Sequence, residues 1–227
     1  MAAQELFTVS LEANPLECWD DESTASALRA LAVRLHSTGI SLRETATVLE
    51  QFGVTRSHQA VFQWVHRTAE EAPDPPTASP SRVAVDETAV KIGTEQQWLY
   101  AAIDVETKLL LGVVVSERRG TDPAAEFLGR LAEKHDFSET TFLVDGMGYL
   151  TALARCDLRG HLDYVERNLI EKWFQTLAMR IDRFHQTWMG ARASAERWLT
   201  AFVYYYNFQR PNQALDNRTP VEEVQNR

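Results

Sequence analysis

The stretch RVAVDETAVKIG, residues 82–93, has the alternating apolar pattern of a β-strand but carries two acids, Asp86 and Glu87, at its centre. A carboxylate in the interior of a sheet is strongly destabilising unless it is paired, protonated or bound to a metal ion. A solvated acid on an edge strand is the alternative. The other acids of the chain, and the elements that carry them, decide between these interpretations.

The segments after residue 93 predict an α/β domain. Short apolar runs bounded by turns predict strands, and apolar residues at helical spacing predict helices. We expect strands at 82–93, 97–107 and 109–117, a helix at 122–136, a strand at 140–146, a helix at 149–156, a strand near 162–166 and a helix at 168–185. This order is typical of a mixed sheet covered by helices.

Two further acids stand at informative places in these elements. Asp145 ends the strand at 140–146, and Glu171 lies one turn into the long helix. If the strands of Asp86 and Asp145 are neighbours, their carboxylates emerge together at the edge where α/β sites form. Three converging carboxylates repel one another and are stable only around cations, and ligand sets made only of oxygen select Mg²⁺ or Mn²⁺. Two such ions can activate water or a 3′-hydroxyl and stabilise the leaving oxygen of a phosphodiester.

Two residues beside these acids have supporting interpretations. Asn168 precedes Glu171 by three residues, on the same helical face, so it is a candidate for orienting that carboxylate by hydrogen bonding. Glu87 should point to the opposite sheet face from Asp86, as a solvated acid or as a support for the site.

Residues 24–69 have the pattern of three short helices. Leucines recur at helical spacing before Gly39, the sequence SLRE at 41–44 matches a capping box, and a third helix begins near Ser57. This arrangement predicts a helix-turn-helix, because exposed Gln and Arg side chains on the third helix can contact bases. The predicted DNA-contacting residues are Arg56, Ser57, His58, Gln59, Gln63 and Arg67. A plain three-helix bundle is the alternative.

The charge distribution supports a division of the chain into parts. The net charge of −9 by itself argues against a nucleic-acid partner. Residues 24–69, however, contain five Arg against two Glu, whereas residues 1–23 contain six acids and no Lys or Arg. Four of the eight prolines fall within 70–82, which predicts an extended connector. We therefore expect an acidic segment at 1–23, a helix-turn-helix domain at 24–69, a linker at 70–82 and a catalytic domain at 83–227.

No feature of the sequence indicates export or a membrane partner. The longest apolar run, 109–115, is too short to span a bilayer, and the acidic start of the chain is the opposite of a signal peptide. Cys18 and Cys156 are isolated, without the spacing of a zinc site or a disulfide framework. We expect a cytoplasmic protein.

Several segments resemble the DDE transposases of insertion sequences. They are VDET at 85–88, AAID at 101–104, FLVDG at 142–146, NLIEKW at 168–173 and FVYYYNFQRPNQALDNRTPVEE at 202–223. The chain is most similar to the insertion sequence six family, particularly to members from halophilic archaea. That relation would also account for the acidic composition and for the presence of only four Lys.

The resemblance implies an RNase H-like catalytic domain behind a small all-α helix-turn-helix domain. It implies that Asp86, Asp145 and Glu171 are the catalytic, metal-binding residues, and that Mg²⁺-dependent cleavage is followed by strand transfer. The chain departs from the family in three places. Only 25 residues separate Asp145 from Glu171, Ala178 stands where relatives carry Lys or Arg, and Asn212 stands where many carry His.

The resulting prediction is a transposase that acts on double-stranded DNA, at the terminal inverted repeats of its element and at the target. We expect it to use Mg²⁺ or Mn²⁺, as two ions, and to work as a homodimer or a larger assembly on DNA. One alternative is a DNA-binding regulator derived from a decayed or domesticated transposase, which Ala178 favours. Another is an RNase H-like nuclease, which leaves the helix-turn-helix unexplained.

Overall fold

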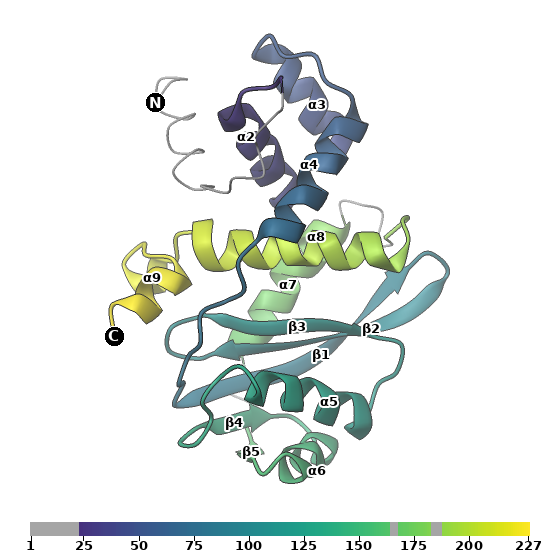
Figure 1. The fold of residues 1–227 in the computed structure, drawn as a ribbon. Helices are drawn as coiled ribbons and strands as arrows, with labels where there is room; N and C mark the ends of the chain where they lie inside the picture. The colour runs from purple at the N-terminus through teal and green to yellow at the C-terminus, as the bar shows by residue number, and fades with distance from the viewer. Residues whose placement is uncertain (1–22, 164–167, 183–187) are drawn as a thin grey trace.

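A mixed sheet organises the larger part of the molecule (Figure 1). The computed structural model describes residues 23–163, 168–182 and 188–227. Within these residues the strands stand in the order β3-β2-β1-β4-β5; β1, β2 and β3 are antiparallel neighbours, and β4 and β5 run parallel to β1. The bounds of the strands are Arg82–Ile92 (β1), Glu95–Asp104 (β2), Leu110–Ser116 (β3), Thr141–Val144 (β4) and Arg159–Leu162 (β5).

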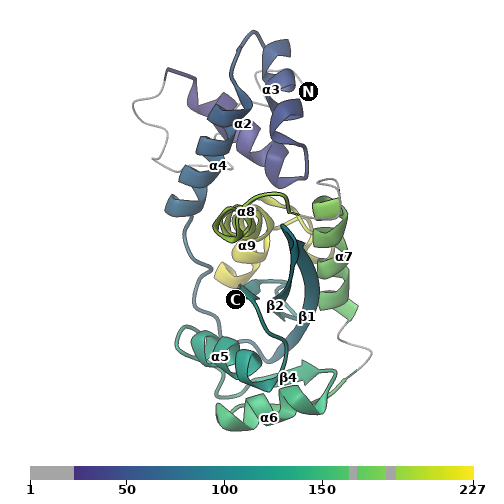
Figure 2. The same ribbon diagram turned by 90° about the vertical axis from the view of Figure 1, so that its right-hand side faces the viewer.

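Helices cover both faces of this sheet (Figure 2). One face packs against α5 (Thr121–Ala132) and α6 (Met147–Arg155), and the other against α7 (Asn168–Asp182) and α8 (Arg192–Tyr204). Beyond α8 come the π-helical turn η2 (Tyr205–Gln209), the 3-10 turn η3 (Gln213–Leu215) and α9 (Pro220–Gln225). In the described part of the chain, no helix has the length and apolar character that crossing a bilayer requires.

The two-sided burial follows from the alternation of residues in β1. Val83 and Val85 belong to the apolar cluster that contains α5 and α6, whereas Ala84 between them belongs to the cluster of α7 and α8. Successive side chains of a strand point to opposite faces, so a strand covered on both sides is apolar at every position. Asp86 is the first residue of β1 that breaks this run.

The structure confirms the predicted order of three strands, helix, strand, helix, strand and helix, except for the place of the last strand. A strand was expected near 162–166, but β5 occupies Arg159–Leu162, and residues 164–166 lie outside the described ranges. Pairing with β4 sets this position, with Phe142 opposite Gly160. A Cβ on Gly160 would stand 2.7 Å from the carbonyl oxygen of Phe142, so close packing, rather than an apolar pattern, selects this stretch.

The three predicted N-terminal helices are confirmed as α2 (Ser26–Ser37), α3 (Leu42–Gln51) and α4 (His58–Glu71). Ser41 and Glu44 form the expected reciprocal capping box at the start of α3. Gly39 and Gly53, which follow α2 and α3, have φ angles of +99° and +76°, a region that favours glycine. Trp64 of α4 is 1% exposed at the centre of this bundle.

The three-helix bundle is joined to the rest of the molecule by packing as well as by the chain. Ala201 of α8 belongs to the same buried cluster as Val61, Trp64 and Leu49. Figures 1 and 2 show α4 descending onto α8, which lies across the top of the sheet layer. The bundle therefore packs against α8 in a fixed position.

The connector between α4 and β1 is attached along its length to the sheet domain. Helix α4 extends to Glu71 and β1 begins at Arg82, so residues 72–81 form the irregular part of the predicted linker. Asp74 pairs with Lys134 at 2.9 Å. Buried Ala78 donates its N–H to Nδ1 of His135 at 3.2 Å, and Nε2 of His135 lies 3.2 Å from the carbonyl oxygen of Leu111. The linker thus has fixed contacts rather than the freedom of a tether.

These contacts require neutral His135. Its Nδ1 accepts a hydrogen bond, so Nε2 must carry the proton, and a second proton would displace the Ala78 N–H. Burial is the largest cause that lowers the pKa of His135 below its usual value, and burial does the same to the pKa of His36. The contribution of His135 to stability is therefore complete above the unfolded pKa of about 6.5 and is lost as the pH falls from there through the lowered pKa of the folded state.

We predict that the free energy of unfolding falls between pH 7 and pH 5, and that His135→Gln makes this fall smaller. Urea titrations of the wild type and the variant at both pH values measure the difference. His58→Gln, at an exposed position, serves as the control and should keep the wild-type pH dependence. An unchanged pH dependence in His135→Gln would contradict the assignment of a neutral, linker-binding imidazole.

Candidate active site

Asp86 and Asp145 are brought together by the pairing of β1 with β4. These strands are parallel neighbours, with Ala84 opposite Leu143. Extending that register by two residues sets Asp86 beside Asp145, which directly follows β4. Neighbouring strands are about 4.8 Å apart, so the two carboxylates leave the sheet side by side. Both residues are partly buried, which keeps them accessible to a ligand.

Glu171 lies on the helix that covers the same face. Ala84, two residues before Asp86 and therefore on its face, packs in one cluster with Ile170, Trp173 and Leu177 of α7. Glu171 is in the first turn of that helix and is partly buried, and Asn168 is its first residue and is exposed. The structure therefore places the third predicted acid on the element that faces the two aspartates.

The described residues do not contain a preformed metal-binding group. Within 23–163, 168–182 and 188–227, no three His, Cys, Asp or Glu side chains are arranged so that they could hold a metal ion. The strand register brings two of the predicted ligands to neighbouring strands, and the three acids do not form a complete ligand set. The assignment of Asp86, Asp145 and Glu171 as metal ligands stays a prediction.

Glu87 has a different environment from the solvated one that the sequence allowed. Its side chain is 5% exposed and accepts hydrogen bonds from the Tyr149 hydroxyl and, at 2.5 Å, from Nε of Arg119. Tyr149 lies on α6, so Glu87 faces the side of the sheet opposite to α7, as predicted. The solvated interpretation was wrong because the residues that bury Glu87 come from a loop and a helix 32 and 62 positions away.

Carboxylates from both faces of the sheet affect the pKa values of Tyr149 and Arg119. Burial is the largest cause that raises the pKa of Tyr149 far above its usual value, and the carboxylates of Glu87 and Asp86 raise it further. The hydrogen bond to Glu87 raises the pKa of Arg119, and the charge of Asp145 adds to this effect. Tyr149 thus stays protonated as a donor, and Arg119 is a cation that pairs with Glu87.

Sequence reasoning missed both of these residues. Arg119 occurs in a short polar loop between β3 and α5, and nothing in the spacing of SERRGT connects it with position 87. Tyr149 has the place of an ordinary apolar residue in a helix. The one available signal was Glu87 itself, because an acid flanked by sheet residues needs donors from elsewhere in the fold.

The predicted DNA-contacting residues divide into two groups in the structure. Ser57 is the N-cap of α4 and accepts a hydrogen bond from the Ala60 N–H. Arg56 donates from Nε to Thr24 Oγ1 at 2.7 Å and from Nη2 to Ser23 Oγ at 3.2 Å. These two residues fix the start of α4. The others, His58, Gln59, Gln63 and Arg67, are exposed on the helix.

A groove runs beside the first turns of α4. It has a volume of about 860 Å³ and lies between α4 and the segment that precedes α8. His58, Gln59 and Phe62 line one side, and Met189 lines the other. Phe62 and Met189 are 36% and 78% exposed, so this groove presents an apolar side chain on each side. His58 and Gln59 border this groove, and Gln63 and Arg67 are not among its lining residues.

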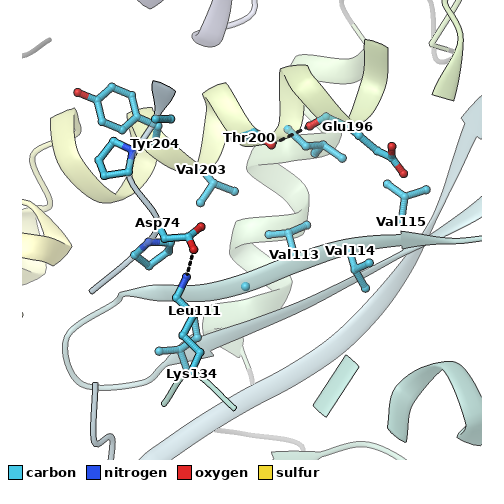
Figure 3. Close-up of a pocket in the computed structure, with 15 residues that line it drawn as sticks. Asp74, Leu111, Val113, Val114, Val115, Lys134, Glu196, Thr200, Val203 and Tyr204 are labelled. Atoms are coloured by element: carbon cyan, nitrogen blue, oxygen red, sulfur yellow. Dashed lines mark hydrogen bonds and ion pairs between the residues drawn. The ribbon is translucent and has the colours of Figure 1, made fainter. Parts of the chain in front are cut away.

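A second pocket lies away from the acids, along the edge strand β3 (Figure 3). It has a volume of about 300 Å³ and is bounded by the linker, β3 and α8, with the Asp74–Lys134 ion pair at its side. None of the predicted site residues is among the described residues that line it. This pocket is therefore separate from the β1–β4 corner.

Part of the sheet domain matches a known protein family. Residues 80–178, from just before β1 into α7, match the family described as a DDE domain. An uncharacterized protein of Methanocaldococcus jannaschii is 29% identical over 185 residues, which are 80% of this chain and 86% of that protein.

Two solved structures are similar in fold. A chain of the simian T-cell lymphotropic virus intasome, solved with the PP2A regulatory subunit B56 gamma, aligns with a TM-score of 0.50 and 12% identity over 86% of this chain and 74% of its own. The HTLV-2 integrase catalytic core domain, solved with magnesium, has a TM-score of 0.48 and 10% identity over 64% of this chain and 97% of its own.

The mixed α/β core therefore resembles the catalytic core of a retroviral integrase. The matched segment contains the paired aspartates and Glu171. This chain is accordingly an enzyme of the DDE type, a nucleotidyl transferase with a transposase-type domain.

The contacts of Arg56 generate a test of its role. We predict that Arg56→Ala lowers the free energy of unfolding by about 1–2 kcal/mol, because it removes hydrogen bonds between the start of α4 and the segment before α2. Gln63→Ala, at an exposed position of the same helix, should change it by less than about 0.5 kcal/mol. Chemical denaturation of both variants measures the difference. Equal stabilities would contradict an anchoring role.

Proposed function

We propose that this protein is a transposase that binds the ends of its own element and catalyses metal-dependent cleavage and strand transfer. The observation that carries the proposal is the β1–β4 register, which sets Asp86 beside Asp145 inside the matched DDE segment. Glu171, on the helix facing that pair, completes the proposed catalytic set. Asn168 is proposed to orient Glu171 from the same helical face.

The donor set fits hard divalent ions. All three proposed ligands are carboxylates, and oxygen ligands select Mg²⁺ or Mn²⁺. Two such ions, when bound, would supply Lewis-acid stabilisation of the charge that develops on a phosphodiester. The carboxylates themselves would hold those ions, and their partial exposure leaves them accessible to the DNA strand.

We propose that residues 24–69 recognise double-stranded DNA at the terminal repeats. The exposed Gln59, Gln63 and Arg67 of α4 are the proposed base-contacting residues, and His58 stands at the start of that helix. Arg56 and Ser57 hold the helix in place for them. The acidic segment 1–23, linker 70–82 and catalytic domain 83–227 complete the division, and a homodimer or larger assembly would bring both element ends and the target together in the cytoplasm.

The finer relation to the insertion sequence six family, of the haloarchaeal type, is also a proposal. The net charge of −9 and the presence of only four Lys support it. An acidic chain repels itself less in concentrated salt, where the Debye length falls to about 3 Å at 1 M.

A DNA-binding regulator is the second candidate. Ala178 lies two turns after Glu171 on α7 and is exposed, so no cation stands at that position to contact DNA. The regulator would keep α4 and its exposed side chains and would lack strand transfer.

The first test distinguishes the two candidates. Asp86→Asn, Asp145→Asn and Glu171→Gln should each lower the strand-transfer rate by at least about 100-fold and leave the affinity for DNA within about twofold, because the carboxylates serve chemistry. Glu126→Gln, which neutralises an exposed acid on α5, is the matched control. Activity in any one of the three variants would remove that residue from the site. A wild-type protein that binds element ends but never joins DNA would establish the regulator.

The second test concerns recognition. Gln59→Ala and Gln63→Ala should each weaken binding to element-end DNA by about 5- to 150-fold, since a bidentate base contact contributes about 1–3 kcal/mol of discrimination. Binding to random DNA should hardly change. Gln213→Ala, in the C-terminal turn η3, is the control. Titrations of both DNA types with each variant decide the matter, and equal losses on both would limit α4 to contacts with the phosphate backbone.

A further inference from the structure

Arg119 is held in an unusual way for a surface arginine. It lies in the loop between β3 and α5, and its Nε donates to Oε1 of Glu87 at 2.5 Å. Its guanidinium carbon is 4.9 Å from the ring centre of Trp98, a distance typical of a cation–π contact. The backbone of the same loop is tied down, because the Gly120 N–H donates to the Tyr100 hydroxyl at 3.0 Å. Two contacts thus fix this side chain, and a third fixes the backbone of its loop.

The partner of Arg119 is itself fully engaged. Glu87 is 5% exposed, and its second oxygen accepts the hydrogen bond from Tyr149. The Arg119 side chain, by contrast, is 58% exposed. Among the described residues, neither Nη1 nor Nη2 of Arg119 donates to an acceptor at hydrogen-bond distance. A buried carboxylate therefore holds one edge of the guanidinium and leaves its outer edge to solvent.

The cluster of Arg119, Glu87 and Tyr149 lies beside the candidate active site. Glu87 directly follows Asp86 in β1, and Tyr149, in the first turn of α6, is four residues after Asp145. Because Arg119 and Tyr149 both donate to Glu87, the cluster borders both aspartates, and the charge of Asp145 acts on Arg119. A cation between acids lowers the repulsion that a polyanion meets there. Phosphate oxygens match the paired N–H groups of a guanidinium edge, and an arginine that is already ordered loses less entropy on binding.

We infer that Arg119 is a binding site for a backbone phosphate of DNA beside the proposed catalytic carboxylates, with Glu87, Trp98 and Tyr149 as its positioning residues. The inference rests on the proposed function, since it takes the DNA strand to pass the β1–β4 corner. The phosphate is bound through Nη1 and Nη2, while Nε remains on Glu87. Arg118, the exposed neighbour in the same loop, takes no part.

Binding is tested on the full chain in the Asp86→Asn background, so that no cleavage occurs. The probe is a labelled linear duplex of random sequence with Mg²⁺ present, because a phosphate contact is independent of sequence. Arg119→Gln should raise the Kd by at least about fivefold and reduce the slope of log K against log salt by about 1. Arg118→Gln, with the same loss of charge one residue away, is the matched control and should change the Kd by less than about twofold.

Two further variants test the geometry. Arg119→Lys keeps the charge but lacks the paired N–H groups, so the salt slope should stay and the Kd should still rise. Glu87→Gln keeps Arg119 but weakens its anchor, so it should raise the Kd by less than Arg119→Gln does. Melting temperatures of all variants are measured in parallel, so that loss of folded protein is separated from loss of binding.

The inference is overturned if Arg119→Gln and Arg118→Gln have the same Kd and salt slope, or if Lys replaces Arg119 without loss. Neither result would touch the proposed strand transfer, which depends on Asp86, Asp145 and Glu171. Conversely, a wild-type chain that never joins DNA would reject the proposed function, and strand transfer that survives Asp86→Asn would only remove Asp86 from the proposed site, while the binding data on Arg119 keep their meaning in both cases.

Discussion

The parallel pairing of β1 with β4 is the constraint on which the site depends. Its register sets Ala84 opposite Leu143, and two residues later Asp86 stands beside Asp145. A shift by one residue would turn one of the two carboxylates to the other face of the sheet, because side chains alternate along a strand. The apolar residues before the acids, 0–1% exposed on both strands, specify that register, so the hydrophobic core positions the charged groups.

The same alternation gives the two adjacent acids of β1 different environments. Asp86 faces the layer of α7, whereas Glu87 faces α5 and α6 and is enclosed by Arg119 and Tyr149. A buried carboxylate is stable only with donors, and here the donors are a protonated phenol and an arginine that also lies near Asp145. One face thus presents carboxylates, and the other supplies a cation to the same corner.

Packing contacts also fix the position of the N-terminal bundle relative to the sheet domain. Helix α4 shares a buried cluster with α8, and the connector after it is held by Asp74, Ala78 and His135. Such packing gives the exposed face of α4 a set direction relative to the β1–β4 corner. The proposed recognition and joining of DNA would need that relation, since a bound end would have to reach the carboxylates.

The sequence by itself determined the elements and the acids. Alternating apolar residues in 82–93, helical spacing in 168–182 and the SLRE capping box predict local structure, because backbone geometry relates spacing to faces. Only the tertiary structure decided which acids accept hydrogen bonds from distant donor side chains. The sequence left Glu87 between a solvated and a supporting role because Arg119 and Tyr149 are distant in sequence. Arg56 gained a structural contact with Thr24, and β5 began early because Gly160 fits against Phe142. In each case the deciding contact is long-range, and a local pattern carries no information about a partner that only folding brings near.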